Sequence, residues 1–213
     1  YKRQVIGKVG WVGKPFADRL LFGFTYSNMY KEIQTGVRQE AVFGEKHRKG
    51  HSLMPSLEYH KRDLFTKGLD VSLTANYNYN LTQNIDTVPY QYNWYGEKQY
   101  TGSKGEQSYQ DNESKNKNWN GTFKADYRLS RTQTFTLSHV LTVFERSNRS
   151  DVNSTSAVSD FTVPKKTRKN ITGLSYRLMP AERWNFSAFG KYYNQHSSGL
   201  VSQNADGIGN YID

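Results

Sequence analysis

The sequence contains no cysteine, which excludes a disulfide framework, a thiolate metal site and a cysteine nucleophile. It also contains no run approaching the roughly 20 consecutive apolar residues that a membrane-spanning helix needs. Aliphatic residues are sparse, and the mean hydropathy is −0.85. A hydropathy profile would therefore describe a soluble protein. The strands of a membrane β-barrel escape that test, because only every second residue of such a strand faces lipid.

Aromatic residues and positive charge are abundant instead. Aromatics make up 15% of the 213 residues, and the formal net charge is +10, which favours anionic partners such as nucleic acid, anionic lipid or an acidic ligand. No signal peptide opens the chain at Tyr1, and residues 209–213 have no terminal character. We therefore expect residues 1–213 to be a partial domain from the middle of a longer protein.

Residues 69–81 alternate without exception between apolar or aromatic and polar side chains. The apolar positions are Leu69, Val71, Leu73, Ala75, Tyr77, Tyr79 and Leu81. A strand places alternate side chains on opposite faces, so the pattern predicts one two-faced strand of about thirteen residues. Globular strands are usually about 5–6 residues long. A strand of this length suits a sheet that separates lipid from water.

The same alternation recurs along the chain and predicts eight strands in four hairpins. Short connections are expected at 13–18, 63–68, 130–132 and 179–182, and long polar ones at 35–50, 83–118, 146–166 and from 195 onward. Pro55 predicts a bulge or bend in its strand. Short turns alternating with long loops are typical of outer-membrane barrels. We therefore predict an all-β fold, the partial wall of an antiparallel up-and-down transmembrane β-barrel.

The alternation also divides the side chains between two faces. The residues expected on the apolar, outer face include Leu69, Val71, Leu73, Ala75, Phe123, Tyr127, Phe186 and Ala188. Those expected on the opposite face include Asn76, Asn78, Thr122, Asp126 and Ser187. Two alternatives stay open: a soluble β-sandwich that binds carbohydrate or mediates adhesion, and a small closed outer-membrane barrel.

Three segments carry a resemblance to a known family: Leu20–Tyr26, Gly68–Tyr77 and Trp184–Tyr193. The residue pattern of these segments resembles that of the barrel of TonB-dependent outer-membrane receptors of the type abundant in Bacteroidetes. The resemblance implies a location in the cell outer membrane and a wider barrel with a plugged lumen. It also implies a plug domain and a TonB-engaging segment outside these residues. The implied function is binding and import of a scarce nutrient, with siderophore, haem, corrinoid, glycan and peptide all open as ligands.

The long stretch 83–118 is the best candidate for contact with that ligand. Its rings Tyr90, Tyr92, Trp94 and Tyr95 can stack on sugars or planar ligands while their polar atoms form hydrogen bonds. The alternative is that these rings only pack the loop against its neighbours.

Positive charge is concentrated where long loops meet the predicted wall. The cations are Lys165, Lys166, Arg168 and Lys169, with a second group at Lys46, Arg48 and Lys49. At the outer rim of a barrel the natural partner is anionic lipid, above all the phosphate of lipopolysaccharide. A merely solvated basic rim is the alternative.

Patterns of catalysis and metal binding are missing. The sequence has no Gly-x-Ser-x-Gly, no His-Glu-x-x-His and no phosphate-cradling glycine loop, so we predict no enzyme activity, no metal site and no cofactor. Ser138 and His139 are adjacent, which puts them on opposite faces of a strand. His47 and His51 lie in or beside one loop, where haem or metal contact is conceivable. No nucleic-acid-binding module is recognisable, so we expect no nucleic-acid partner.

Overall fold

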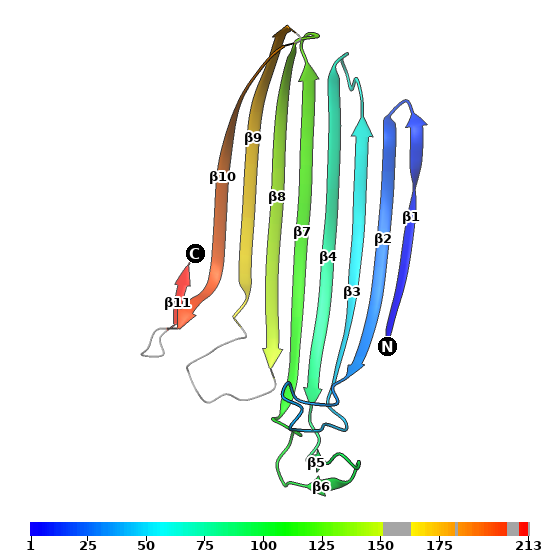
Figure 1. Cartoon of the computed structure of the whole chain (residues 1–213), viewed down its shortest axis with the longest axis vertical. Coiled ribbons are helices and arrows are strands. Elements are labelled where there is room, and N and C mark those ends of the chain that lie inside the picture. Colours follow the sequence, from blue (N-terminus) through cyan, green and yellow to red (C-terminus); the bar gives the residue numbers. More distant parts are fainter. Residues whose placement is uncertain (151–162, 182, 204–208, 213) are drawn as a thin grey trace.

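A computed structural model of the chain describes residues 1–150, 163–181, 183–203 and 209–212. Its eight long strands are β1 (Lys2–Lys14), β2 (Ala17–Glu32), β3 (His47–Lys61), β4 (Leu69–Asp86), β7 (Gln110–Arg128), β8 (Gln133–Ser150), β9 (Lys165–Ala181) and β10 (Trp184–Gln203). Three short strands are β5 (Tyr90–Tyr92), β6 (Lys98–Tyr100) and β11 (Gly209–Ile212) (Figure 1).

The long strands form one antiparallel sheet in chain order, β1-β2-β3-β4-β7-β8-β9-β10, and β11 pairs with the end of β10. This confirms the predicted eight-strand, up-and-down antiparallel arrangement. The sheet is open, because β1 and β10 do not pair with each other in the described part of the chain. The alternative of a small closed barrel is therefore not formed by the described residues. The only other sheet among the described residues is the β5–β6 hairpin, so the layered sandwich is also not formed.

The register of the sheet fixes which side chains share a face. Directly paired residues of an antiparallel sheet lie on the same face. Leu73 pairs with Phe123, whereas Thr74 next to it pairs with Thr122. Following such pairs from β4 to β10 keeps every residue of the predicted apolar set on one face and every residue of the predicted polar set on the other. We call these the apolar face and the polar face.

Short turns lie at one end of the sheet and long connections at the other, as predicted (Figure 1). The loop boundaries were wrong, however, because the strands continue into the predicted loops. The misassigned strand segments are 13–14, 17–18, 47–50, 83–86, 110–118, 146–150, 165–166, 179–181 and 195–203. Most of these segments carry polar side chains on both faces, which removes the alternation from the sequence. The backbone ladder does not depend on side-chain polarity and continues through them.

Pro55 does not cause the predicted bulge. Leu53 pairs with Tyr79 and Ser56 with Asn76, so the register between β3 and β4 is continuous across the proline. Only the pairing of Met54 and Pro55 with β4 is interrupted. Proline lacks the backbone N–H, so the ladder loses a hydrogen bond without gaining a residue.

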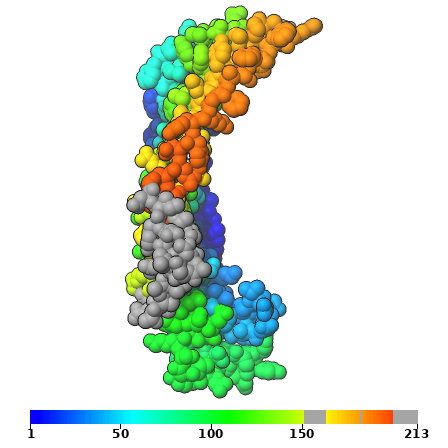
Figure 2. All heavy atoms as spheres, turned by 90° about the vertical axis from the view of Figure 1, so that its left-hand side faces the viewer, coloured from blue at the N-terminus to red at the C-terminus, as the bar shows by residue number. Residues whose placement is uncertain are grey.

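The sheet has almost no core. Among the described residues, the buried apolar side chains are Ala17, Phe43 and Val71. The chain of 24.6 kDa exposes 15283 Å² of surface. A compact monomer of this mass exposes about 10,000 Å². In edge-on view the molecule is a narrow, bowed slab that thickens at the long-loop end (Figure 2). Both faces of the sheet are therefore open to their surroundings.

The turn between β3 and β4 depends on one glycine. Gly68 has a φ of +90°, and a Cβ there would lie 2.6 Å from the carbonyl oxygen of Arg128. Its N–H donates to Asp63 Oδ1 at 2.6 Å, which closes the turn. Backbone conformation and space both exclude a side chain at this position.

We predict that Gly68→Ala destabilises the folded protein by about 1–3 kcal/mol, because alanine at a positive φ is strained. Gly121→Ala is the matched control, since a Cβ at Gly121 meets no atom within 4 Å. Thermal unfolding followed by far-ultraviolet circular dichroism measures both. Equal unfolding temperatures for the two variants would contradict the strain argument.

Candidate functional site

The apolar face carries hydrophobic side chains on every long strand, which we call the belt, and many of them are exposed on the strands other than β3 and β4. Examples on β1, β2, β9 and β10 are Val9, Phe22, Leu174 and Phe186, with exposed fractions of 69%, 46%, 58% and 60%. Isolated exposed hydrophobic residues are normal, but a continuous apolar surface of this extent marks an interaction with a partner or a membrane.

The belt runs obliquely across the sheet. One row of directly paired residues is Val5, Tyr26, Leu53 and Tyr79 on β1 to β4, followed by Lys117, Glu145, Lys166 and Ser198 on β7 to β10. The same row is thus apolar on four strands and polar on the other four. Apolar positions on β7 to β10 lie closer to the short turns.

The obliquity can be measured from the register. One row of directly paired residues contains Trp11 and Leu20 on β1–β2, and Thr172 and Tyr192 on β9–β10. On β1–β2 this row is the border of the belt nearest the short turns. On β9–β10 the same row is the border nearest the long loops. The belt occupies four rows on β1–β2 and four rows on β9–β10. Between these two strand pairs it therefore shifts by three rows, or about 20 Å along the strands. The two pairs are about 29 Å apart across the sheet. A belt of constant height therefore requires strands tilted by about 35°.

Aromatic side chains lie along both borders of the belt. Tyr77 and Trp119 pack together at the loop-side border, with ring centroids 4.4 Å apart. Phe135 and Tyr176 pack at the turn-side border at 4.7 Å. Aromatic rings with an apolar body and a polar edge favour the boundary between hydrocarbon and water.

The four predicted lipid-contacting cations lie on β9, two on each face of the sheet. Lys166 and Arg168 lie on the apolar face, just beyond the loop-side border, whereas Lys165 and Lys169 lie on the polar face. On the apolar face they are joined by Lys117 of β7, whose Nζ lies 3.8 Å from Glu145. The sequence missed Lys117, because it stands in a segment assigned to a loop.

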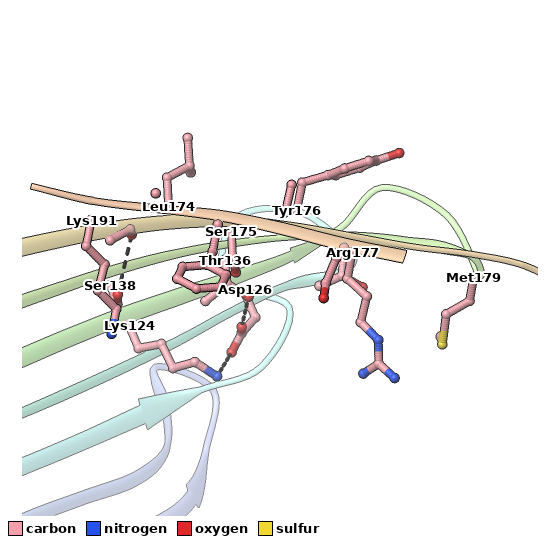
Figure 3. Close-up of a pocket in the computed structure, with 16 residues that line it drawn as sticks. Lys124, Asp126, Thr136, Ser138, Leu174, Ser175, Tyr176, Arg177, Met179 and Lys191 are labelled. Atoms are coloured by element: carbon pink, nitrogen blue, oxygen red, sulfur yellow. Dashed lines mark hydrogen bonds and ion pairs between the residues drawn. The ribbon is translucent and has the colours of Figure 1, made fainter. Parts of the chain in front are cut away.

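The polar face has an ionic character near the turns. A pocket of about 630 Å³ is lined there by Lys124, Asp126, Arg177 and Lys191 among others. Asp126 accepts a hydrogen bond from Thr136 at 2.6 Å and is paired with Lys124 at 2.7 Å. Figure 3 shows these charged side chains on one side of the strands, with Leu174 and Tyr176 on the other. The pocket residues therefore display the two-faced alternation directly.

The four predicted ligand-binding rings lie in the long β4–β7 connection but do not form one surface. Tyr92 packs over Gly44 and donates from its hydroxyl to Glu45 Oε1 at 2.8 Å. Tyr90 is half-buried against Tyr100, with ring centroids 5.8 Å apart. Trp94 and Tyr95 are exposed by 66% and 90% near the tip of the β5–β6 hairpin. Tyr90 and Tyr92 thus have partners within the protein, and Trp94 and Tyr95 are accessible.

Buried charges lock the β2–β3 connection against the β4–β7 connection. Lys46, Asp86 and Glu106 are 9%, 1% and 4% exposed. Lys46 Nζ lies 3.3 Å from Asp86 Oδ2 and donates to Gln107 Oε1 at 2.7 Å. We call these groups the loop latch.

Backbone N–H groups satisfy the carboxylates of the loop latch. Glu106 accepts from Gly44, Glu45 and Lys46, and Asp86 accepts from Glu106, Gln107 and Ser108. The sequence expectation that Lys46 belongs to an exposed basic rim is therefore wrong, because the lysine is buried against a carboxylate. Nothing in the sequence signals this cluster, since its members are single charges in separate polar segments.

Possible catalytic and metal ligands are separated. Ser138 Oγ donates to the Gly173 carbonyl at 3.3 Å, whereas His139 Nδ1 lies 2.8 Å from Thr172 Oγ1 on the other face. His47 and His51 stack near Tyr30 and Tyr79, with centroids 5.1 and 5.9 Å apart. Within the described ranges no three His, Asp or Glu side chains are grouped as metal ligands would be.

No protein family, curated protein or solved structure matches this chain. None of the described residues belongs to a helix long and apolar enough to cross a membrane.

Removing the cation of the loop latch should release the loops. We expect Lys46→Met to destabilise the latch by about 3–5 kcal/mol, because it leaves the buried Asp86 carboxylate without its counter-charge. Chymotrypsin cleavage within 87–109 should therefore be faster. Lys67→Met, which removes an exposed lysine from the short turn between β3 and β4, is the control and should cleave at the rate of the unmodified protein. Unchanged cleavage of Lys46→Met would show that the backbone hydrogen bonds suffice.

Tyr92 should titrate at a higher pH than an ordinary tyrosine. Its hydrogen bond to Glu45, reinforced by partial burial, raises the pKa of Tyr92 from 10.0 to about 12. The folded loop holds this proton more tightly than the unfolded chain. Its stabilisation is therefore complete below pH 10 and is lost as the pH rises toward about 12. Ultraviolet titration of tyrosinate should show a late phase that disappears in Tyr92→Phe and persists in Tyr95→Phe.

Proposed function

We propose that this chain is part of the wall of a TonB-dependent outer-membrane receptor, which binds and imports a scarce nutrient. The observation that carries the proposal is the oblique belt. Between β1–β2 and β9–β10 the belt moves by three rows toward the short turns. A membrane imposes such a shift, because its plane cuts tilted strands at successive heights.

The dimensions of the belt fit a bilayer. Outer-membrane barrels tilt their strands by about 35–45° and carry an apolar band about 25 Å tall. The register gives a tilt of about 35°. Along β4, the apolar positions from Leu69 to Tyr79 rise about 33 Å, which corresponds to about 27 Å along the membrane normal. The aromatic borders and the cations beyond the loop-side border are then at headgroup height, beside lipopolysaccharide phosphate.

The open edges favour a barrel that needs more strands. The outer edge of β1 presents unpaired backbone N–H and C=O groups along its length. Such groups are not tolerated in hydrocarbon, where only helices and closed barrels satisfy the backbone. In this proposal, further strands of the receptor pair with β1 and β10. The polar face lines the lumen and contacts a plug domain, which links the receptor to TonB.

The latched loops suit the outer, nutrient-binding side. They join the strands at the end opposite to the short turns, and the loop latch holds them in a fixed arrangement that exposes Trp94 and Tyr95. A preorganised loop pair loses less conformational entropy when it binds a ligand.

An arginine scan of one strand tests the membrane assignment. Leu73 lies near the middle of the belt on β4, and Asn76 lies nearby on the polar face. In the outer-membrane protein that carries this chain, Leu73→Arg should lower the free energy of unfolding from lipid vesicles by about 2–4 kcal/mol. Asn76→Arg is the matched control and should lower the free energy of unfolding much less, because on this proposal its side chain faces water. Equal costs would mean that the belt does not contact lipid.

A further inference from the structure

One row of the polar face places a lysine over a glycine. The row runs from Lys191 of β10 through Gly173 of β9 to Ser138 of β8, and each residue is directly paired with the next. Gly173 is buried, and a Cβ there would lie 2.7 Å from Ser138 Oγ and 3.6 Å from Lys191 Cγ. The aliphatic stem of Lys191 therefore extends over the glycine, in space that a side chain at Gly173 would restrict.

The same arrangement occurs near the other edge of the sheet. Lys8 of β1 is paired with Gly23 of β2, which is paired with Ser56 of β3. A Cβ at Gly23 would lie 3.6 Å from Lys8 Cγ, as at Gly173. There the lysine has a counter-charge, because Lys8 Nζ donates to Glu58 Oε1 at 3.3 Å. Glu58 stands two residues from Ser56, toward the short turns.

Lys191 has no carboxylate that corresponds to Glu58. Two residues from Ser138 toward the short turns, in the corresponding place on β8, stands Thr136. Lys191 forms no ion pair with any of the described residues. Two lysines with the same placement thus differ in one respect, since the chain supplies an anion to Lys8 and none to Lys191.

The pocket that Lys191 lines has an excess of positive charge. It is the pocket of about 630 Å³ in Figure 3, and its charged side chains are Lys124, Asp126, Arg177 and Lys191. Asp126 is already paired with Lys124 at 2.7 Å. Arg177 donates from Nε to Asn185 Oδ1 at 3.2 Å and is in no ion pair within the described part of the chain. Lys191 and Arg177 are therefore uncompensated cations in one pocket.

An exposed aromatic ring stands between these two cations. Phe189 of β10 is 78% exposed and lines the pocket. Its row lies between the row of Lys191 and the row of Arg177. Met179 lines the same pocket, and a thioether makes favourable contacts with an aromatic ring. Serine and threonine hydroxyl groups complete the lining. The pocket thus combines cations, hydrogen-bond donors and an apolar surface.

We propose that this pocket binds a small, ring-bearing carboxylate or phosphate, whose anionic group lies at Lys191. The bound anion gives Lys191 the counter-charge that Glu58 gives Lys8. Hydrogen bonds from an ammonium group to anionic oxygens are roughly twice as strong as those between neutral groups. The ring of the ligand packs on Phe189. A cationic ligand would be repelled by the excess positive charge, and a neutral one would gain no ion pair from Lys191 or Arg177.

Ring compounds that differ in their charged group test the pocket. The full-length protein that contains this chain is titrated with benzoate, phenyl phosphate, benzyl alcohol and benzylammonium, and binding is followed by saturation-transfer NMR of the ring protons. At least one of the two anions should bind. The alcohol and the ammonium compound should bind at least about tenfold more weakly, because they lose a charge-assisted hydrogen bond. Binding of one anion alone identifies the anionic group as carboxylate or phosphate.

Three variants test the role of Lys191. Lys191→Gln should weaken binding of the anion about tenfold, because it removes the positive charge. Lys191→Arg keeps the charge and should retain most of the affinity. Lys8→Gln is the matched control, since it removes a lysine of the same placement that Glu58 already compensates. It should bind the anion as the unmodified protein does.

Three results would overturn the proposal. They are the failure of both anions to bind, binding of benzylammonium as tight as that of the anions, and an affinity that Lys191→Gln leaves unchanged. Lys191 is exposed, so the protein should fold with glutamine at this position. Equal unfolding temperatures of Lys191→Gln and the unmodified protein check this.

The anion pocket goes beyond the receptor assignment and is separable from it, because Lys191 and Leu73 lie on opposite faces of the sheet. A protein that tolerates Leu73→Arg as well as Asn76→Arg but loses anion binding in Lys191→Gln would refute the membrane assignment alone. A protein that is destabilised only by Leu73→Arg and binds neither anion would refute only the anion pocket.

Discussion

The structure depends on an uninterrupted antiparallel ladder whose register keeps side chains of one kind on one face. With only three buried apolar side chains among the described residues, hydrophobic burial within the chain cannot hold eight strands together. The ladder supplies the order, and it extends even through Pro55 and through segments that are polar on both faces. Such a sheet gains its hydrophobic stabilisation from whatever covers its apolar face.

The same register produces both functional surfaces from simple alternation. On one face it aligns apolar side chains into a belt that lies closer to the short turns on β9–β10 than on β1–β2. On the other it brings Lys191, Gly173 and Ser138 into one row. A shift of one residue between β8 and β9 would destroy both, because it would exchange the faces of one strand relative to its neighbour. The apolar face and the polar face are thus two consequences of one constraint.

The long connections follow a different principle. The β2–β3 and β4–β7 connections have little strand pairing beyond the β5–β6 hairpin, and they are ordered mainly by buried charge. Lys46, Asp86 and Glu106 come from two connections and are satisfied mainly by backbone N–H groups. Such a network defines one arrangement, since each carboxylate would be left costly and unpaired in another. The sheet therefore depends on its surroundings for hydrophobic stabilisation, whereas these two connections are stabilised by contacts within the chain.

The sequence by itself determined the eight long strands, their order and their up-and-down pairing. It also determined the face of each side chain wherever apolar and polar residues alternate, because a two-residue period is visible there. It did not determine the strand ends, since 110–118 is polar on both faces and its strand character comes only from pairing with β4 and β8. It identified Lys165–Lys169 as basic but not their division between faces, and it misjudged Lys46. The belt's obliquity and the loop latch were decided only by the tertiary structure. Each depends on which residues of separate strands lie opposite one another, and that register is a property of the assembled sheet.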